Sequence, residues 1–225
     1  MAKHIRALTV KFDLPISYRE IPLFRGAVLK SMGDRANVLY HNHTGEETFR
    51  YSYPLIQYKR LGGKAAIICV EEGTELVGEI LSNVSGNLMI GENAAKCLIE
   101  QVETKDIIVQ TSEQLSTYHL HRWLPLNSKN YNDYQNAESY VAKIQILEHV
   151  LTGNILSFLK GIGIRLDEQM VVNITDIKKQ QLIYYKRIKL LALDVEFRTN
   201  IHLPSLIGLG KNASLGFGTI TKIKN

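Results

Sequence analysis

Hydrophobic and polar residues alternate in patterns that predict a strand at the start of the chain and a helix after it. In residues 4–12 apolar side chains recur at every second position, which is the period of a strand. Pro15 is expected to end this strand. In residues 22–32 apolar side chains recur at helical spacing, with a proline in the first turn and Gly33 directly after the last turn. The chain therefore opens with a strand followed by an amphipathic helix.

The next segments complete a familiar order of elements. Residues 49–58 and 65–70 are rich in apolar and aromatic side chains, and Gly62 and Gly63 between them suit a tight turn of a hairpin. Thr74 is predicted to cap a second helix, and extended sequence then continues to about residue 110. The order β-α-β-β-α-β is that of a ferredoxin-like unit.

The second half of the chain repeats part of this order. Strands are predicted at residues 115–126, 170–177, 182–185, 188–199 and 217–223, with one long helix at 136–160 that Gly161 and Gly163 end. A second helix is missing from this half. The prediction is an α+β fold of two tandem ferredoxin-like, RRM-like domains, residues 1–113 and 114–225, of which the second is degenerate.

A glycine-spaced loop precedes the last predicted strand. Residues 208–218 read GLGKNASLGFG, so two Gly-x-Gly pairs flank Lys211. Glycine lets backbone N–H groups approach a phosphate chain where a Cβ atom would obstruct them. The loop lacks a third glycine at Ala213, as a dinucleotide fingerprint requires, and lacks Ser or Thr at Asn212, as a P-loop requires. A nucleic-acid loop and a plain tight turn between two strands both remain open.

Charge is unevenly distributed along the 225 residues. The net charge is +5, and the net charges of residues 1–65, 66–117, 118–159 and 160–225 are +6, −7, 0 and +6. This segregation suggests that the two ends of the chain share a basic face for a polyanion, although ordinary solvated surface charge gives the same totals.

Cysteine content and hydropathy exclude several classes of protein. Cys69 and Cys97 lie in apolar surroundings without Cys-x-x-Cys spacing, so buried thiols are expected rather than a disulfide or a zinc site. The start of the chain has no apolar signal core, and no uncharged run approaches the roughly 18 residues that span a bilayer. We expect a cytoplasmic protein with no membrane partner.

Together, the tandem ferredoxin-like units, the glycine-rich loop, the basic ends and the lack of a nucleotide motif resemble the RAMP superfamily of CRISPR-associated proteins. Within it the chain resembles the Cas-six type of repeat-RNA endoribonuclease. Residues 208–218 match the family's glycine-rich signature loop, and His41-Asn42-His43 stands where the family usually carries its catalytic histidine. The leucine-rich stretch 151–161 is similar to the C-terminal half of one subgroup. The resemblance implies antiviral defence by cleavage of CRISPR repeat RNA to guide RNA, with no metal and no cofactor.

RNA can be cut without metal when its own 2′-hydroxyl attacks the neighbouring phosphorus and histidines move the protons. We predict His41 and His43 as acid and base, with Lys30, Tyr51 and Arg50 as groups that stabilise the phosphorane charge. Surface-loop histidines without a role are the alternative. The His-x-His spacing also suits a metal, but no acid or cysteine cluster in the sequence completes a site.

Other candidates lie in the second half of the chain. His119 and His121 form a second His-x-His pair, for which solvent exposure is favoured over RNA contact, and Trp123 is expected in a core. Lys211 is the best phosphate contact, with Lys222 and Arg198 flanking it. The predicted RNA-binding residues are Gly208, Gly210, Lys211, Gly216, Gly218, Arg198, Lys186 and Arg187. The basic run that contains Lys186 and Arg187 equally suits a solubilising hairpin turn.

Three functions follow from these residues. The first is a metal-independent endoribonuclease that acts on CRISPR repeat RNA and leaves a 2′,3′-cyclic phosphate. The second is a catalytically inactive RAMP protein that binds guide RNA as a subunit of an interference complex. The third is a metal hydrolase that uses a His-x-His pair. The expected partner is repeat or guide RNA, and a homodimer or further complex subunits remain open.

Overall fold

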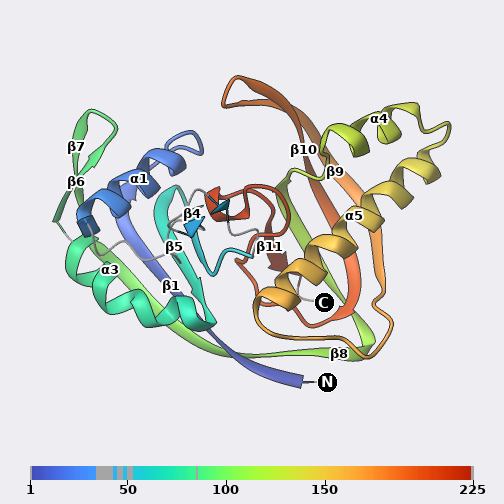
Figure 1. Cartoon of the computed structure of the whole chain (residues 1–225), viewed down its shortest axis with the longest axis horizontal. Coiled ribbons are helices and arrows are strands. Elements are labelled where there is room, and N and C mark those ends of the chain that lie inside the picture. The colour runs from blue at the N-terminus through green and yellow to red at the C-terminus, as the bar shows by residue number, and fades with distance from the viewer. Residues whose placement is uncertain (1, 34–42, 45–47, 50–52, 85, 224–225) are drawn as a thin grey trace. The chain divides into compact units, whose positions relative to one another are not determined.

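The structure is a computed structural model whose contacts divide the chain into two units, each treated by itself (Figure 1). The described residues are 2–33, 43–44, 48–49, 53–84 and 86–223. The first unit comprises His4–Ile107 with Ser214–Gly216, and the second comprises Met1–Lys3, Ile108–Ala213 and Phe217–Asn225.

Helices and strands alternate in the described ranges. The α-helices are α1 (Ile21–Met32), α3 (Val77–Val84), α4 (Ser128–Asn136) and α5 (Tyr140–Gly161), and the 3-10 helices are η2 (Glu71–Leu76) and η3 (Ala213–Leu215). The strands are β1 (Ala2–Pro15), β2 (His43–Thr44), β3 (Thr48–Phe49), β4 (Ile56–Leu61), β5 (Lys64–Val70), β6 (Gly86–Ile90), β7 (Asn93–Cys97), β8 (Ile99–Trp123), β9 (Val172–Tyr185), β10 (Ile188–Ile201) and β11 (Thr219–Lys222).

The first unit packs two helices against an antiparallel sheet. In this sheet β4, β5, β1 and the start of β8 are neighbours in that order. Alternate side chains of β1 point into the core, and Val10 and Phe12 are fully buried there together with Phe24 of α1 and Ile80 of α3. This is the core that the alternation of residues 4–12 and the helical stripe of residues 22–32 predict.

Local signals explain the edges of these elements. Gly62 and Gly63 have φ angles of +57° and +87°, which closes the β4–β5 hairpin with the expected primed turn. The N–H of Gly33 donates to the Lys30 carbonyl and ends α1 as predicted. The Thr74 cap was a wrong prediction, because Thr74 lies inside η2, where its Oγ1 donates to the Glu71 carbonyl at 2.7 Å.

The second unit packs α5 against a sheet in which β8 lies between β11 and β10, and β10 pairs with β9. All these pairs are antiparallel. The core joins Tyr118 and Trp123 of β8 to Phe197 of β10 and to Leu151 and Phe158 of α5. Tyr118 and Phe197 stack with ring centroids 5.5 Å apart.

The helical part of the second unit differs from its prediction. The helix predicted at residues 136–160 is α5, which begins only at Tyr140 because Ser139 has an extended backbone and its Oγ accepts the Ala142 N–H. Helix α4 at residues 128–136 was not predicted. In the same way the Asn127 side chain caps α4. The chain is an α+β protein, as its sequence predicts.

Candidate functional site

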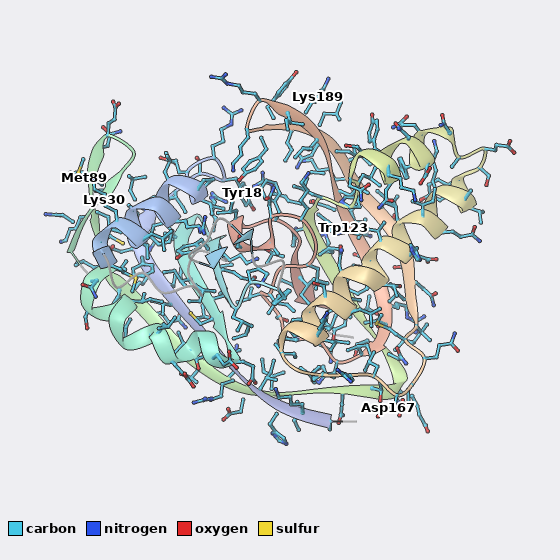
Figure 2. All side chains as sticks on the ribbon, in the orientation of Figure 1. Tyr18, Lys30, Met89, Trp123, Asp167 and Lys189 are labelled. Atoms are coloured by element: carbon cyan, nitrogen blue, oxygen red, sulfur yellow. The ribbon has the colours of Figure 1, made fainter. Side chains whose placement is uncertain are left out.

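The four predicted catalytic residues fall in and after the end of α1. Lys30 is exposed in the last turn of that helix, where a cation interacts favourably with the helix dipole (Figure 2). The backbone of His43 lies in β2 and pairs with Phe49 of β3. His41 and Tyr51, like Arg50, lie outside the described residues.

Gly208, Gly210 and Gly218 of the glycine-rich loop lie in the second unit, where the surroundings of Gly210 and Gly218 leave little room for a side chain. Gly218 has φ +60°, and a Cβ atom there would lie 1.9 Å from the Leu209 carbonyl oxygen. Gly210 has φ +85°, and a Cβ atom there would lie 2.6 Å from the Asn154 side-chain oxygen. Gly208 and Gly218 are buried and hold the loop to its neighbours, since Gly208 bridges Thr219. Close packing alone explains why these positions are glycine.

Gly216 belongs to the first unit, where it is also buried. It has φ +80°, and a Cβ atom there would lie 2.6 Å from the Ile21 Cδ1 atom. The buried glycines therefore act through packing, and the exposed part of the loop is the turn around Lys211.

Lys211 borders a cavity of about 360 Å³ in the second unit, with both polar and apolar residues in its lining. Amide and imidazole side chains share this lining with it, namely Asn127, Asn130, Asn154 and His149. Two of these amides are held in place, since Asn154 accepts the Trp123 indole N–H at 2.9 Å and Asn127 accepts the Asn130 N–H. Trp123 itself is fully buried, which confirms that it belongs to a core (Figure 2).

Arg198 and Lys222 do not flank Lys211 as the sequence suggested. Lys222 lines a different cavity, of about 540 Å³, together with Thr117 and His202. Arg198 is exposed on β10, directly opposite Thr117. The second unit therefore carries cations beside two separate cavities, because β11 leads the chain away from the loop that holds Lys211.

The β9–β10 hairpin presents cations and apolar groups at its tip. Lys186 and Arg187 form its two-residue turn with φ angles of +48° and +66°. Beside them Tyr184 is 75% exposed and Ile188 is 60% exposed, and Lys189 pairs with Tyr184 (Figure 2). A solubilising turn does not require exposed apolar side chains, so this tip has the composition of a binding surface.

His119 and His121 lie together on β8, with ring centroids 3.8 Å apart. Both residues are of intermediate burial, and 43% of the His121 side chain is exposed, so the expected solvent exposure holds only in part for this pair. Asp194 of β10 stands beside them, 3.9 Å from the His121 Nδ1 atom. Sequence patterns missed Asp194 because it follows the pair by about 70 positions, and only the pairing of β8 with β10 brings it close.

Three buried groups in the first unit have strongly shifted pKa values. Burial raises the pKa of the Cys69 thiol to about 12, and burial with the nearby Asp13 charge raises that of Cys97 to about 12. Both cysteines are therefore inert free thiols, as predicted. Burial lowers the pKa of Lys59 to about 7, a shift that the sequence did not indicate. In the part of the chain that the structure describes, no helix is long and apolar enough to cross a membrane.

Two protein families match this chain, one in each half of the sequence. The N-terminal domain family of Cas6b matches residues 3–108, and the C-terminal domain family of Cas6b matches residues 110–223. An uncharacterized protein of Methanocaldococcus jannaschii is 30% identical over 102 residues, which are 45% of this chain and 68% of the relative.

Solved structures agree with the fold. A crystal structure of Cas6b superposes with a TM-score of 0.85 at 26% identity, over 98% of this chain and 100% of the other. A Cas6b described as a CRISPR RNA processing endoribonuclease gives a TM-score of 0.75 at 23% identity, over 98% and 100%. A RAMP protein described as binding different RNA substrates gives 0.53 at 14% identity, over 97% and 100%.

These matches confirm the predicted two-domain ferredoxin-like fold. They also agree with the resemblance that the glycine-rich loop and the position of His41 indicate. Since the two family matches together span nearly all of its residues, the chain belongs to the Cas6b family of RAMP proteins.

Proposed function

We propose that this protein is an endoribonuclease that cleaves CRISPR repeat RNA to mature guide RNA without a metal ion. The observation that carries the proposal is the match of both Cas6b domains, which leaves almost no part of the chain unassigned. A relative that is 23% identical is described as a CRISPR RNA processing endoribonuclease, which supports the same activity here.

In the proposed reaction the 2′-hydroxyl of the RNA attacks the adjacent phosphorus and the bond to the 5′-oxygen breaks. One imidazole of His41 and His43 removes the 2′-proton, and the other protonates the leaving 5′-oxygen. Each such transfer is worth about 10²–10⁴-fold in rate. The products are a 2′,3′-cyclic phosphate and a 5′-hydroxyl, so bonds and protons balance without a co-reactant.

Lys30 and Tyr51 are proposed to stabilise the negative charge that develops on the phosphorane oxygens. Lys30 is suited to this role because its side chain is exposed at the end of α1, 13 positions before the β2 strand that holds His43. An ammonium group placed close to a developing oxyanion acts as a preorganised electrostatic partner.

The RNA strand is proposed to contact the second unit at two places. At the cavity beside Lys211, an ammonium group and several amides offer donors to a phosphate and to base edges. At the β9–β10 tip, Lys186 and Arg187 suit phosphates and Tyr184 suits a stacked base, which is worth roughly 1–3 kcal/mol. Arg198 is a further phosphate contact of the same kind.

A cleavage assay with a labelled repeat oligonucleotide in EDTA tests the proposal. We expect a product that ends in a 2′,3′-cyclic phosphate, at the same rate with and without the chelator. Tight binding without any cleavage would instead indicate an RNA-binding subunit of an interference complex. Cleavage that EDTA abolishes would indicate a metal hydrolase.

A further inference from the structure

A compact group of three side chains in the second unit has no place in the proposed cleavage reaction. The imidazoles of His119 and His121 and the carboxylate of Asp194 each offer one atom, and these three atoms lie within 4.8 Å of one another. The two histidines are on β8, and Asp194 is on the neighbouring strand β10. The side chain of His121 is 43% exposed and that of Asp194 is 19% exposed.

A β-bulge fixes this arrangement. Leu193 pairs with Trp123 and Val195 pairs with Leu120, so two residues of β8 stand opposite Asp194 alone. One of the two, Arg122, has φ +48°, and its N–H donates to the Asp194 Oδ1 atom at 2.7 Å. The other carboxylate oxygen, Oδ2, is thereby left facing His121.

The histidines share a face because they are two residues apart on a strand, while Tyr118 and Leu120 point into the core. The Nε2 atom of His119 is buried and has no hydrogen-bond partner among the described residues. A buried polar atom without a hydrogen-bond partner costs about 1–3 kcal/mol of stability. A ligand bound to this nitrogen would remove that cost.

The neighbouring strands β9 and β11 place a paired cation and two neutral residues near the group. On β9, Lys178 is held by Asp176 at 2.8 Å and by Glu196 at 3.3 Å, so its charge is already matched. On β11, the residues paired with His119 and His121 are Thr221 and Thr219, which are neutral.

We propose that His119, His121 and Asp194 form a binding site for a divalent transition-metal cation with three protein ligands and one open position. Zn²⁺ fits best, because it accepts imidazole nitrogen and carboxylate oxygen in tetrahedral geometry, whereas Mg²⁺ and Ca²⁺ favour oxygen ligands alone. Ligand atoms around tetrahedral zinc stand about 3.3 Å apart for metal–ligand distances near 2.0 Å. The three atoms now lie within 4.8 Å of one another, so coordination requires them to move closer together.

The site is independent of the proposed cleavage and is tested without measuring it. Full-length protein stripped of metal is titrated with Zn²⁺ by calorimetry, and Co²⁺ is added in parallel as a spectroscopic probe of tetrahedral coordination. We expect saturable binding that His121→Ala or Asp194→Asn weakens by about 100-fold or more, since even outer-shell partners of a metal are worth 10–100-fold. The amide introduced by Asp194→Asn still offers an oxygen to the Arg122 N–H, so this variant keeps the bulge and removes the charge.

Two control variants make the outcome specific. His149→Ala removes an exposed histidine of α5 in the same unit and should leave Zn²⁺ affinity unchanged. A variant lacking both His41 and His43 removes the other His-x-His pair and should also retain this binding. Zn²⁺ should raise the melting temperature of the wild type but not that of His121→Ala. The proposal would be overturned if the wild type did not bind Zn²⁺ saturably. It would also be overturned if either control variant lost Zn²⁺ binding while His121→Ala kept it.

Discussion

Replacement of Gly218 by alanine should destabilise the protein far more than replacement of an equally twisted glycine elsewhere. Gly218 has φ +60°, a conformation that costs an L-residue about 1–2 kcal/mol. Its added Cβ atom would lie 1.9 Å from the Leu209 carbonyl oxygen, so the backbone must move. That movement breaks two hydrogen bonds, from the Leu209 N–H to the Gly218 carbonyl at 2.8 Å and from the Gly218 N–H to the Arg122 carbonyl at 3.2 Å.

The loss is estimated from these parts. Each hydrogen bond contributes about 1 kcal/mol net, so with the cost of the φ angle Gly218→Ala should lose about 3–4 kcal/mol of unfolding free energy. Gly163→Ala isolates the conformational cost, because Gly163 has φ +72° and its nearest neighbour would be the Lys3 Nζ atom at 3.7 Å. We expect it to lose about 1–2 kcal/mol.

Gly153→Ala is the control in the opposite direction. Gly153 lies within α5 with nothing within 4 Å of an added Cβ atom, so alanine should stabilise the helix by about 0.5–1 kcal/mol. Urea unfolding followed by circular dichroism measures all three variants. If Gly218→Ala lost no more than Gly163→Ala, close packing would not be the reason for glycine in this loop.

Further predictions concern catalysis, RNA contact and a buried charge. His41→Ala and His43→Ala should each slow cleavage about 10²–10⁴-fold with RNA affinity within a few-fold; normal rates in both variants would place the site elsewhere. Lys211→Ala should weaken RNA binding and reduce the slope of log K against log salt by about 0.7. Lys105→Ala, in the first unit, is the control and should not show this reduction. Equal slopes in the two variants would mean that Lys211 makes no phosphate contact. Lys59 binds more protons unfolded than folded between its lowered pKa of about 7 and its ordinary value of 10.5, so it favours stability as pH rises through that range. Lys59→Met should therefore be more favourable relative to wild type at pH 7 than at pH 10, as measured by urea unfolding, and a difference that did not shrink toward pH 10 would contradict this assignment.

Much of the first unit could be predicted from sequence because its signals are local. Each of the elements predicted there is specified by residues that are close together in the sequence. Examples are the apolar alternation before Pro15, the helical stripe that ends at Gly33 and the turn at Gly62 and Gly63. The length of β8 could not be predicted, because residues 99–114 are mostly exposed polar side chains without apolar alternation. Leu23 belongs to the apolar residues counted in the predicted helical stripe of residues 22–32, but it is 46% exposed and lies outside the buried face.

Some residues of the candidate sites could also be predicted from local sequence, and others could not. The glycine spacing around Lys211 and the tip at Lys186 are visible as short motifs, although the sequence did not show that packing explains Gly218. Asp194 and Lys59 carry no local signal. Asp194 reaches His121 only through the pairing of β8 and β10, and the buried state of Lys59 depends on the tertiary fold around β4.

The proposed function requires that the 2′-hydroxyl of the repeat RNA itself attacks the scissile phosphate. A repeat oligonucleotide that carries one 2′-deoxynucleotide at the scissile position, compared with the all-ribose oligonucleotide, tests this requirement. We expect equal binding of the two and no cleavage at the deoxy position. Cleavage of the deoxy oligonucleotide at the normal rate would refute the proposed mechanism.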